Sequence, residues 1–144
     1  MGEKRKSLTS LFAVAGFLAS TLSFACPSLQ VFYENLESEP TAIVEALESI
    51  LDQCYTNSEY FALNGAAYLE MGDLLRALES LERALLLDPR NGSAAVDFAE
   101  VLYSQGQVNN AIEVNSGLLS RDDLPDDLRE AIFLRQRAWR RDRS

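Results

Sequence analysis

Residues 58–91 read SEYFALNGAAYLEMGDLLRALESLERALLLDPRN, and this stretch decides the fold class. Apolar residues recur at helical spacing over about 58–71 and again over about 74–87, where leucines follow one another three or four positions apart. Gly72 and Asp73 separate the two segments, and the Pro- and Gly-containing cluster 88–92 ends the second. The stretch therefore predicts two antiparallel helices joined by a tight turn.

The same stretch resembles the tetratricopeptide repeat, a 34-residue helical hairpin with the pattern Trp-x2-Leu-Gly-x2-Tyr, Ala-x3-Phe and Pro. The residues that carry the resemblance are Phe61, Asn64, Gly65, Tyr68, Ala77, Leu81, Ala84 and Pro89. Phe61 replaces the Trp, and Asn64 and Leu81 depart from the pattern. The resemblance implies an all-α fold of stacked hairpins that binds a protein partner.

Each matched position has a physical purpose in such a hairpin. Gly65 and Ala77 are small where the two helices cross, so that the backbones can approach closely. Tyr68 and Leu81 fill the space on either side of the crossing. Pro89 ends the second helix because it lacks a backbone N–H donor.

A second, more degenerate copy follows at the same spacing. Adding 34 to the positions of Gly65, Gly72 and Ala77 gives Ala99, Gly106 and Ala111, all of them small residues. Further correspondences are the apolar residues Phe98, Leu102 and Leu118, Asn115 in the slot of Leu81, and Asp123 in the slot of Pro89. Helices are predicted at about 93–105 and 108–120. Three coincidences of small residues at one offset favour a true repeat over unrelated helical hairpins.

The remainder of the chain completes a small array. Residues 26–57 form a helix-turn-helix pattern with few small residues, which we interpret as an atypical first hairpin, as terminal repeats often are. Residues 58–91 and 92–125 are the two repeats, and 126–144 are a capping helix with a basic tail. We predict three hairpins in a right-handed α-solenoid closed by the C-terminal cap, near the smallest array that stands alone.

The first 25 residues have the layout of a secretory signal peptide. Basic residues at 4–6 precede an apolar run at 11–18, and Ser23 and Ala25 place small residues before a cut after Ala25. An uncleaved membrane anchor is the competing interpretation. The segment from residue 8 to 25 carries five Ser or Thr residues, whereas a bilayer span needs about 20 predominantly apolar residues.

The charge of the chain argues against nucleic-acid binding. The whole sequence carries a net charge of −9, and cleavage after Ala25 leaves 21 acidic and 10 basic residues. Affinity for nucleic acid rests mainly on Lys and Arg that neutralise phosphates. Most of the acidic excess is expected to be a solvated face, and the basic residues gather at 135–143, which hold five Arg and one Asp.

Cys26 and Cys54 are the only cysteines, and in an exported protein an even count indicates a disulfide. The hairpin predicted for 26–57 brings its start beside its end, and therefore brings these two residues together. The bridge is expected to stabilise the fold by ~3 kcal/mol. The alternative is acylation of Cys26 as in bacterial lipoproteins, although Ser23 and Phe24 differ from the usual residues before such a cysteine.

No catalytic constellation stands out, and we predict a protein without enzymatic activity, cofactor or bound metal. The sequence contains no His, so the usual nucleophile–base pairs cannot be assembled, and it contains no Gly-rich phosphate loop. A two-carboxylate hydrolase is not excluded by residue type. The acidic residues Asp122, Asp123, Asp126 and Asp127 can attract a divalent cation, but a turn followed by a helix start explains them equally well.

By the resemblance, the first helix of each repeat lines a concave partner-binding groove. The residues implied to be exposed there are Glu59, Ala62, Ala66, Leu69 and Glu70, then Ser93, Val96, Asp97, Glu100, Tyr103 and Ser104. An acidic rim over an apolar floor favours a basic or neutral amphipathic peptide. The alternative is that Leu69 and Val96 simply pack against neighbouring helices.

Together these features predict a non-enzymatic adaptor that binds a protein or peptide in the periplasm of a Gram-negative-type envelope, in envelope assembly or secretion. Similar family members that grip acidic chaperone tails use Lys and Asn in the groove. Ala62, Ala66 and Asp97 stand at three of those positions, so that activity is not supported. A lipid-anchored envelope component with acylated Cys26 is the alternative.

Overall fold

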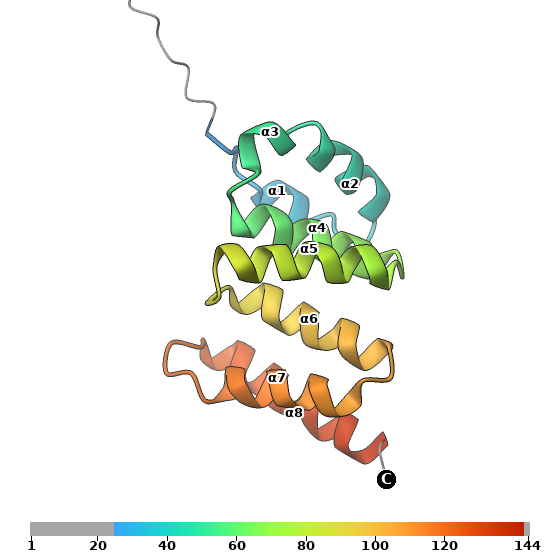
Figure 1. Ribbon diagram of the computed structural model, residues 1–144, viewed down its shortest axis with the longest axis vertical. Coiled ribbons are helices and arrows are strands. Elements are labelled where there is room, and N and C mark those ends of the chain that lie inside the picture. The colour runs from blue at the N-terminus through green and yellow to red at the C-terminus, as the bar shows by residue number, and fades with distance from the viewer. Residues whose placement is uncertain (1–24, 143–144) are drawn as a thin grey trace, which may run out of the picture.

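The computed structural model of the chain describes residues 25–142, and within that range it contains helices and no strand. The helices are α1 (Gln30–Tyr33), α2 (Pro40–Glu48), α3 (Leu51–Cys54), α4 (Ser58–Glu70), α5 (Leu74–Leu87), α6 (Gly92–Ser104), α7 (Val108–Leu119) and α8 (Asp126–Asp142). They stack along one axis, with α2 and α3 at one end and α8 at the other (Figure 1). The arrangement confirms the prediction of a repeat-like helical solenoid. The predicted signal peptide lies outside the described residues, except for its last residue, Ala25.

Side-chain caps begin three of the four helices of the two repeats. The Oδ1 atoms of Asn57, Asp73 and Asn91 accept hydrogen bonds from backbone N–H groups three residues further on, at 3.0–3.1 Å. Each cap satisfies one of the N–H groups that a helix start leaves without an intrahelical partner. The starts of α4, α5 and α6 are thus encoded locally in the sequence.

Gly72 and Gly106 make the turns inside the two repeats, as the sequence predicts. Their φ angles are 74° and 78°, a left-handed conformation that glycine adopts without strain. In each turn the next residue donates its backbone N–H to a carbonyl five positions back: Asp73 to Tyr68 at 2.9 Å, and Gln107 to Leu102 at 2.8 Å. The two repeats therefore turn by the same mechanism, 34 residues apart.

Gly65 lies where α4 crosses α5. A Cβ atom added to it would stand 2.5 Å from Leu81 Cγ and 3.3 Å from the Ala77 carbonyl oxygen. Leu81 and Ala77 are fully buried, so neither can move aside freely. This contact confirms the interpretation of Gly65 as a close-approach position.

The equivalent place in the second repeat is packed differently. Ala99 and Asn115 stand 34 residues after Gly65 and Leu81, and both are fully buried. Within the described part of the chain, neither Nδ2 nor Oδ1 of Asn115 has a hydrogen-bond partner. A buried amide without partners costs stability, so the second repeat has the weaker core at this point.

The first hairpin departs from a simple pair of helices. Its first helix, α1, spans four residues and is followed by turns, and the second breaks after Glu48 before resuming as α3. Pro40 occupies the first position of α2, where its missing N–H is harmless. Cys26 and Cys54 form a disulfide with a Cα–Cα distance of 4.7 Å, which confirms the predicted pairing.

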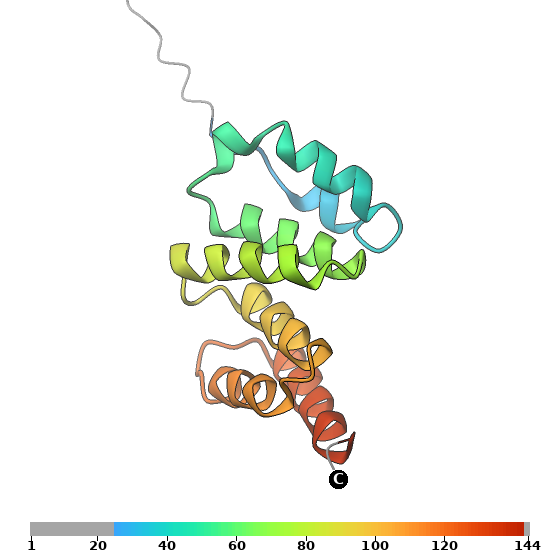
Figure 2. The ribbon, with the colours of Figure 1, turned by 45° about the vertical axis from the view of Figure 1, so that its right-hand side comes forward.

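Both ends of the array pack onto the repeats. Tyr60 of α4 donates its hydroxyl to the Leu47 carbonyl oxygen at 3.0 Å, which fixes α2 against α4. At the other end Ile132, Gln136 and Trp139 form the buried face of α8. The views of Figures 1 and 2 agree that α8 lies beside α7. Within residues 25–142, no helix is both long and apolar enough to cross a membrane.

Candidate functional site

The groove residues implied by the sequence lie on α4 and α6, but the structure exposes only some of them. Glu59 and Glu70 are exposed, and Leu69, Asp97, Glu100 and Tyr103 are half-buried. Ser93, at the start of α6, and Ser104, at its end, are also exposed.

Three positions expected to form an exposed apolar floor are buried instead. Ala62 is 2% exposed, and Ala66 and Val96 are 8% exposed, so the prediction that they face the groove openly is wrong. Ala62 belongs to the core shared with the first hairpin. Val96 packs with Leu124 and Ile132, which cover α6 from the C-terminal side. The alternative that Val96 simply packs against a neighbouring helix is the one observed.

The predicted groove residues that stay accessible include carboxylates contributed by both repeats. Burial raises the pKa of Asp97 to about 6, and the carboxylates of Glu100 and Glu70 add to this rise, whereas the Arg135 guanidinium opposes it. The three carboxylates therefore lie close enough for their charges to interact. A groove with this charge attracts cations and repels anionic segments.

Two residues that were not predicted as groove residues contact the carboxylates of this set. Tyr33, beside α4, donates its hydroxyl to Glu59 Oε1 at 2.5 Å, and burial together with this bond raises the pKa of the Tyr33 phenol. Arg135 of α8 approaches Glu100, with 3.5 Å between Nε and Oε2. Its Nη1 is buried without a hydrogen-bond partner among the described residues. The positive charge of Arg135 partly offsets the negative charge of these carboxylates.

Tyr103 holds the C-terminal cap in place. Its ring stacks on the indole of Trp139 with 4.6 Å between centroids, and its hydroxyl donates to Asp142 Oδ2 at 2.7 Å. Replacing Tyr103 would therefore loosen α8 as well as change the groove. Variants that test the groove are better placed at its carboxylates.

Glu70, one of the predicted groove residues, also lines a surface hollow of about 450 Å³ beside the first hairpin. Its walls are Tyr33, Leu36, Ser38 and the carboxylate-bearing Glu34, Glu37 and Glu70. Tyr33 and Glu70 thus belong both to the groove and to this hollow. The acidic surface extends beyond the two repeats onto the first hairpin.

Residues 68–131 match the family model of the tetratricopeptide repeat, from the end of α4 into α8. This match supports a tetratricopeptide repeat in that part of the chain. No curated protein matches the chain. Members of this family are typically non-enzymatic scaffolds that mediate protein–protein interaction.

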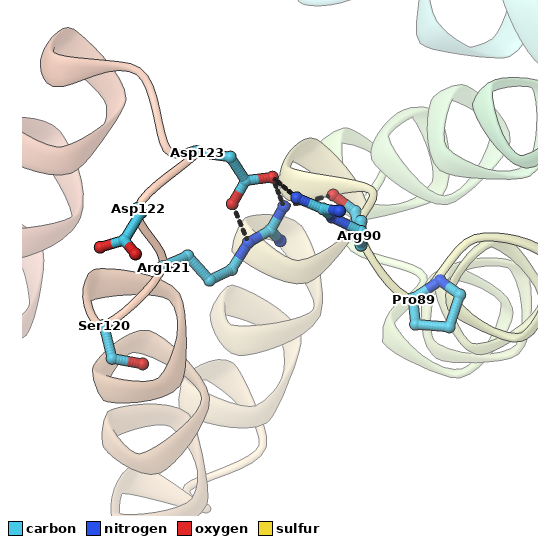
Figure 3. A pocket seen from close by; sticks show the side chains of 6 residues that line it. All are labelled: Pro89, Arg90, Ser120, Arg121, Asp122 and Asp123. Atoms are coloured by element: carbon cyan, nitrogen blue, oxygen red, sulfur yellow. Dashed lines mark hydrogen bonds and ion pairs between the residues drawn. The ribbon is translucent and has the colours of Figure 1, made fainter.

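One acidic turn residue, Asp123, joins the two successive repeats (Figure 3). Asp123 Oδ2 accepts hydrogen bonds from Arg90 at 2.7 Å and Arg121 at 3.0 Å, and Arg121 also donates to the Arg90 carbonyl oxygen at 2.8 Å. The two guanidinium groups hold the pKa of Asp123 well below its usual range. Asp123 occupies the slot of Pro89, and here it ties the end of one repeat to the end of the next.

These bonds occupy both carboxylate oxygens of Asp123, so few lone pairs remain to bind a cation. Its carboxylate is engaged by two guanidinium groups, and Pro89, Arg90, Ser120 and Arg121 line the hollow around it together with Asp122 and Asp123 (Figure 3). Within residues 25–142, no three His, Cys, Asp or Glu side chains are grouped so that they can hold a metal ion. The ion pairs of Asp123 with Arg90 and Arg121 give this acidic turn a structural role.

The buried carboxylate of Asp97 predicts a pH dependence of stability. Its pKa is higher in the folded protein, about 6, than the 3.8 of a free aspartate, so the folded state binds the proton more tightly. The free energy of unfolding is then expected to fall as the pH rises from about 4 to about 6. Asp97→Asn should raise stability at pH 7 by about 1–2 kcal/mol and flatten this slope.

Urea unfolding of wild type and Asp97→Asn at pH 4 and pH 7 measures the effect. Asp88→Asn is the matched control, since Asp88 is exposed and lies in the turn between repeats. The prediction is contradicted if wild type and Asp97→Asn have the same free energy of unfolding at both pH values. The groups that face Asp97 come from α4, α6 and α8 and, through Tyr33, from α1.

Proposed function

We propose that this protein is an exported, non-enzymatic adaptor that binds a basic protein segment in its acidic groove. The observation that supports the proposal is the electrostatic effect of Glu70 and Glu100 on Asp97, whose pKa burial also raises. Placing like charges together costs folding stability, and a cationic partner would relieve that cost. Leu69, half-buried beside them, offers an apolar contact for an amphipathic segment.

The second part of the proposal is that the protein is exported. The disulfide between Cys26 and Cys54 is compatible with an oxidising compartment, and the basic and apolar start of the sequence has the layout of a signal peptide. We place the adaptor in a bacterial periplasm, in envelope assembly or secretion. Mass spectrometry of the exported protein should show a chain that begins at Cys26; a chain that begins at Met1 contradicts cleavage.

The alternative of a lipid anchor has a chemical obstacle. Acylation of Cys26 as in lipoproteins uses the same sulfur that is bonded to Cys54. While that bond is intact, the sulfur is not available for a thioether to lipid. Partition of the exported protein into the membrane fraction with Cys54 as a free thiol would restore the alternative.

Binding of an amphipathic peptide with Lys residues on one face tests the groove. We expect Glu70→Gln with Glu100→Gln to raise the dissociation constant of this peptide about tenfold, because each removed contact with a partner charge contributes ~1 kcal/mol or less. Binding should also weaken as salt is added. Fluorescence anisotropy of the labelled peptide measures both effects.

The matched control is Glu79→Gln with Glu82→Gln, which removes the same charge from exposed positions of α5, outside the groove. It is expected to change the dissociation constant less than about twofold, since long-range charge is screened. Equal loss of binding in both variants would show that the overall charge attracts the peptide and would refute the groove. Circular dichroism confirms that each variant keeps its helices.

A further inference from the structure

The C-terminal end of the stack is an unusual cap. Terminal units of repeat arrays normally turn a polar face to solvent. Here α8 turns Phe133 and Leu134 outward, each 55% exposed. Arg137 and Arg141 are exposed on the same side of the helix, one and two turns after Phe133. We call the exposed face of α8 over residues 133–141 the basic end; it is apolar and positively charged, whereas Asp127 and Glu130 are exposed in the two preceding turns of the helix.

The opposite end of the stack has the complementary character. Leu51 and Tyr55 are 42% and 60% exposed around α3. Glu45 and Glu48 are exposed on α2, on the side away from the buried Ile43, Val44 and Leu47. The hairpin 26–57 contains six acidic residues and no basic residue. We call the exposed surface of α2 and α3 the acidic end.

We propose that copies of this protein associate end to end, with the basic end of one copy on the acidic end of the next. Each end combines two large exposed apolar side chains with charges of one sign, and the signs are opposite. Apolar contact supplies the favourable burial, and the opposite charges set the orientation and exclude pairing of like ends. The two ends lie at opposite poles of the molecule, so one contact leaves a free end of each kind (Figure 1).

A second copy fits the basic end better than an anionic membrane does. A basic, apolar helix face can lie on anionic lipid, but this chain carries a net charge of −9, which opposes approach to a negatively charged surface. The acidic end, in contrast, is present on every copy. Contact between two different surfaces is heterologous and continues into a ring or an open chain of copies.

The contact would leave the proposed groove accessible. Its carboxylates lie on α4 and α6, in the middle of the stack, between the two ends (Figure 1). Association of copies would therefore repeat the groove along the assembly. Several grooves on one assembly raise the avidity for a partner with several basic segments.

Sedimentation velocity of the protein purified after expression of the full chain, with its disulfide intact, tests the association. We expect the average mass to increase from micromolar to millimolar concentration and the association to weaken in high salt. Arg137→Glu with Arg141→Glu should raise the dissociation constant at least about tenfold, and so should Glu45→Arg with Glu48→Arg. All four side chains are exposed, and circular dichroism checks that the variants stay folded.

Mixing the two charge-reversed variants gives the decisive result. Each variant has ends of one sign and should be monomeric alone, whereas the mixture again presents opposite ends and should associate. A wild type that stays monomeric at millimolar concentration, or a mixture that does not associate, overturns the proposal. Binding of the wild-type monomer to phosphatidylglycerol vesicles through Arg137 and Arg141, without self-association, also overturns it and assigns the basic end to lipid.

Discussion

Replacing Cys26 and Cys54 together by alanine is expected to lower the free energy of unfolding by about 3–4 kcal/mol. The disulfide joins residues 28 positions apart, and a cross-link that closes a loop of this length restricts the unfolded chain by about that amount in the chain-entropy model. The first hairpin has few other constraints, because α1 and α3 span only four residues each. Urea unfolding followed by circular dichroism measures the loss.

Reduction of the wild type is the matched control, since it opens the same bond without a substitution. Cys54 is fully buried, so alanine there also leaves a small void, and the reduced wild type should lose slightly less stability than the double variant. Amide hydrogen exchange should accelerate most in α2 and least in α7. An oxidised and a reduced protein that unfold at the same urea concentration would show that the bridge does not stabilise the fold.

Helices α4 to α8 could be predicted from the sequence to within about two residues, because their limits are set by local chemistry. Asn57, Asp73 and Asn91 cap helix starts with their own side chains. Gly72 and Gly106 stop helices because they adopt positive φ angles. None of these signals depends on residues far along the chain.

The first hairpin could not be predicted to the same degree, because its apolar pattern reports burial and not backbone conformation. Leu29, Phe32, Tyr33 and Leu36 follow helical spacing, and all four are at least partly buried. The backbone nevertheless leaves the helix after Tyr33 and continues in turns. The disulfide and the contacts of α2 with α4 hold these side chains in the core without a longer helix.

The predicted groove residues lie on α4 and α6, but the sequence did not predict which of these positions remain exposed. Ala62 and Val96 are covered by the first hairpin and by α8, which are distant in sequence from the repeats they cover. The same distant elements bring Tyr33 to Glu59 and Arg135 to Glu100. A repeat pattern describes contacts within and between repeats, whereas these contacts come from the two atypical ends of the array.

The largest gain in stability is expected from Ala99→Gly combined with Asn115→Leu, which gives the second repeat the pair found in the first. Leucine at 115 removes a buried amide without hydrogen-bond partners and adds buried apolar surface. Glycine at 99 makes the room that Gly65 makes for Leu81, at a cost of about 1 kcal/mol in helix propensity. The net increase in the free energy of unfolding should be about 2–3 kcal/mol, measured by urea unfolding.

Comparing each single variant with the double variant isolates the steric effect of the Ala99 methyl group. Asn115→Leu alone should gain much less than the pair. In the first repeat a Cβ on Gly65 would meet Leu81 at 2.5 Å, and we expect the Ala99 methyl group to meet a leucine at 115 in the same way. Gly65→Ala is the matched control in the first repeat, and it should destabilise by about 2 kcal/mol because it adds the methyl group against a full-sized leucine. The coupling between positions 99 and 115 should therefore exceed about 1 kcal/mol in a double-mutant cycle. Strictly additive single variants would mean that the two repeats do not share the crossing geometry that their common spacing predicts.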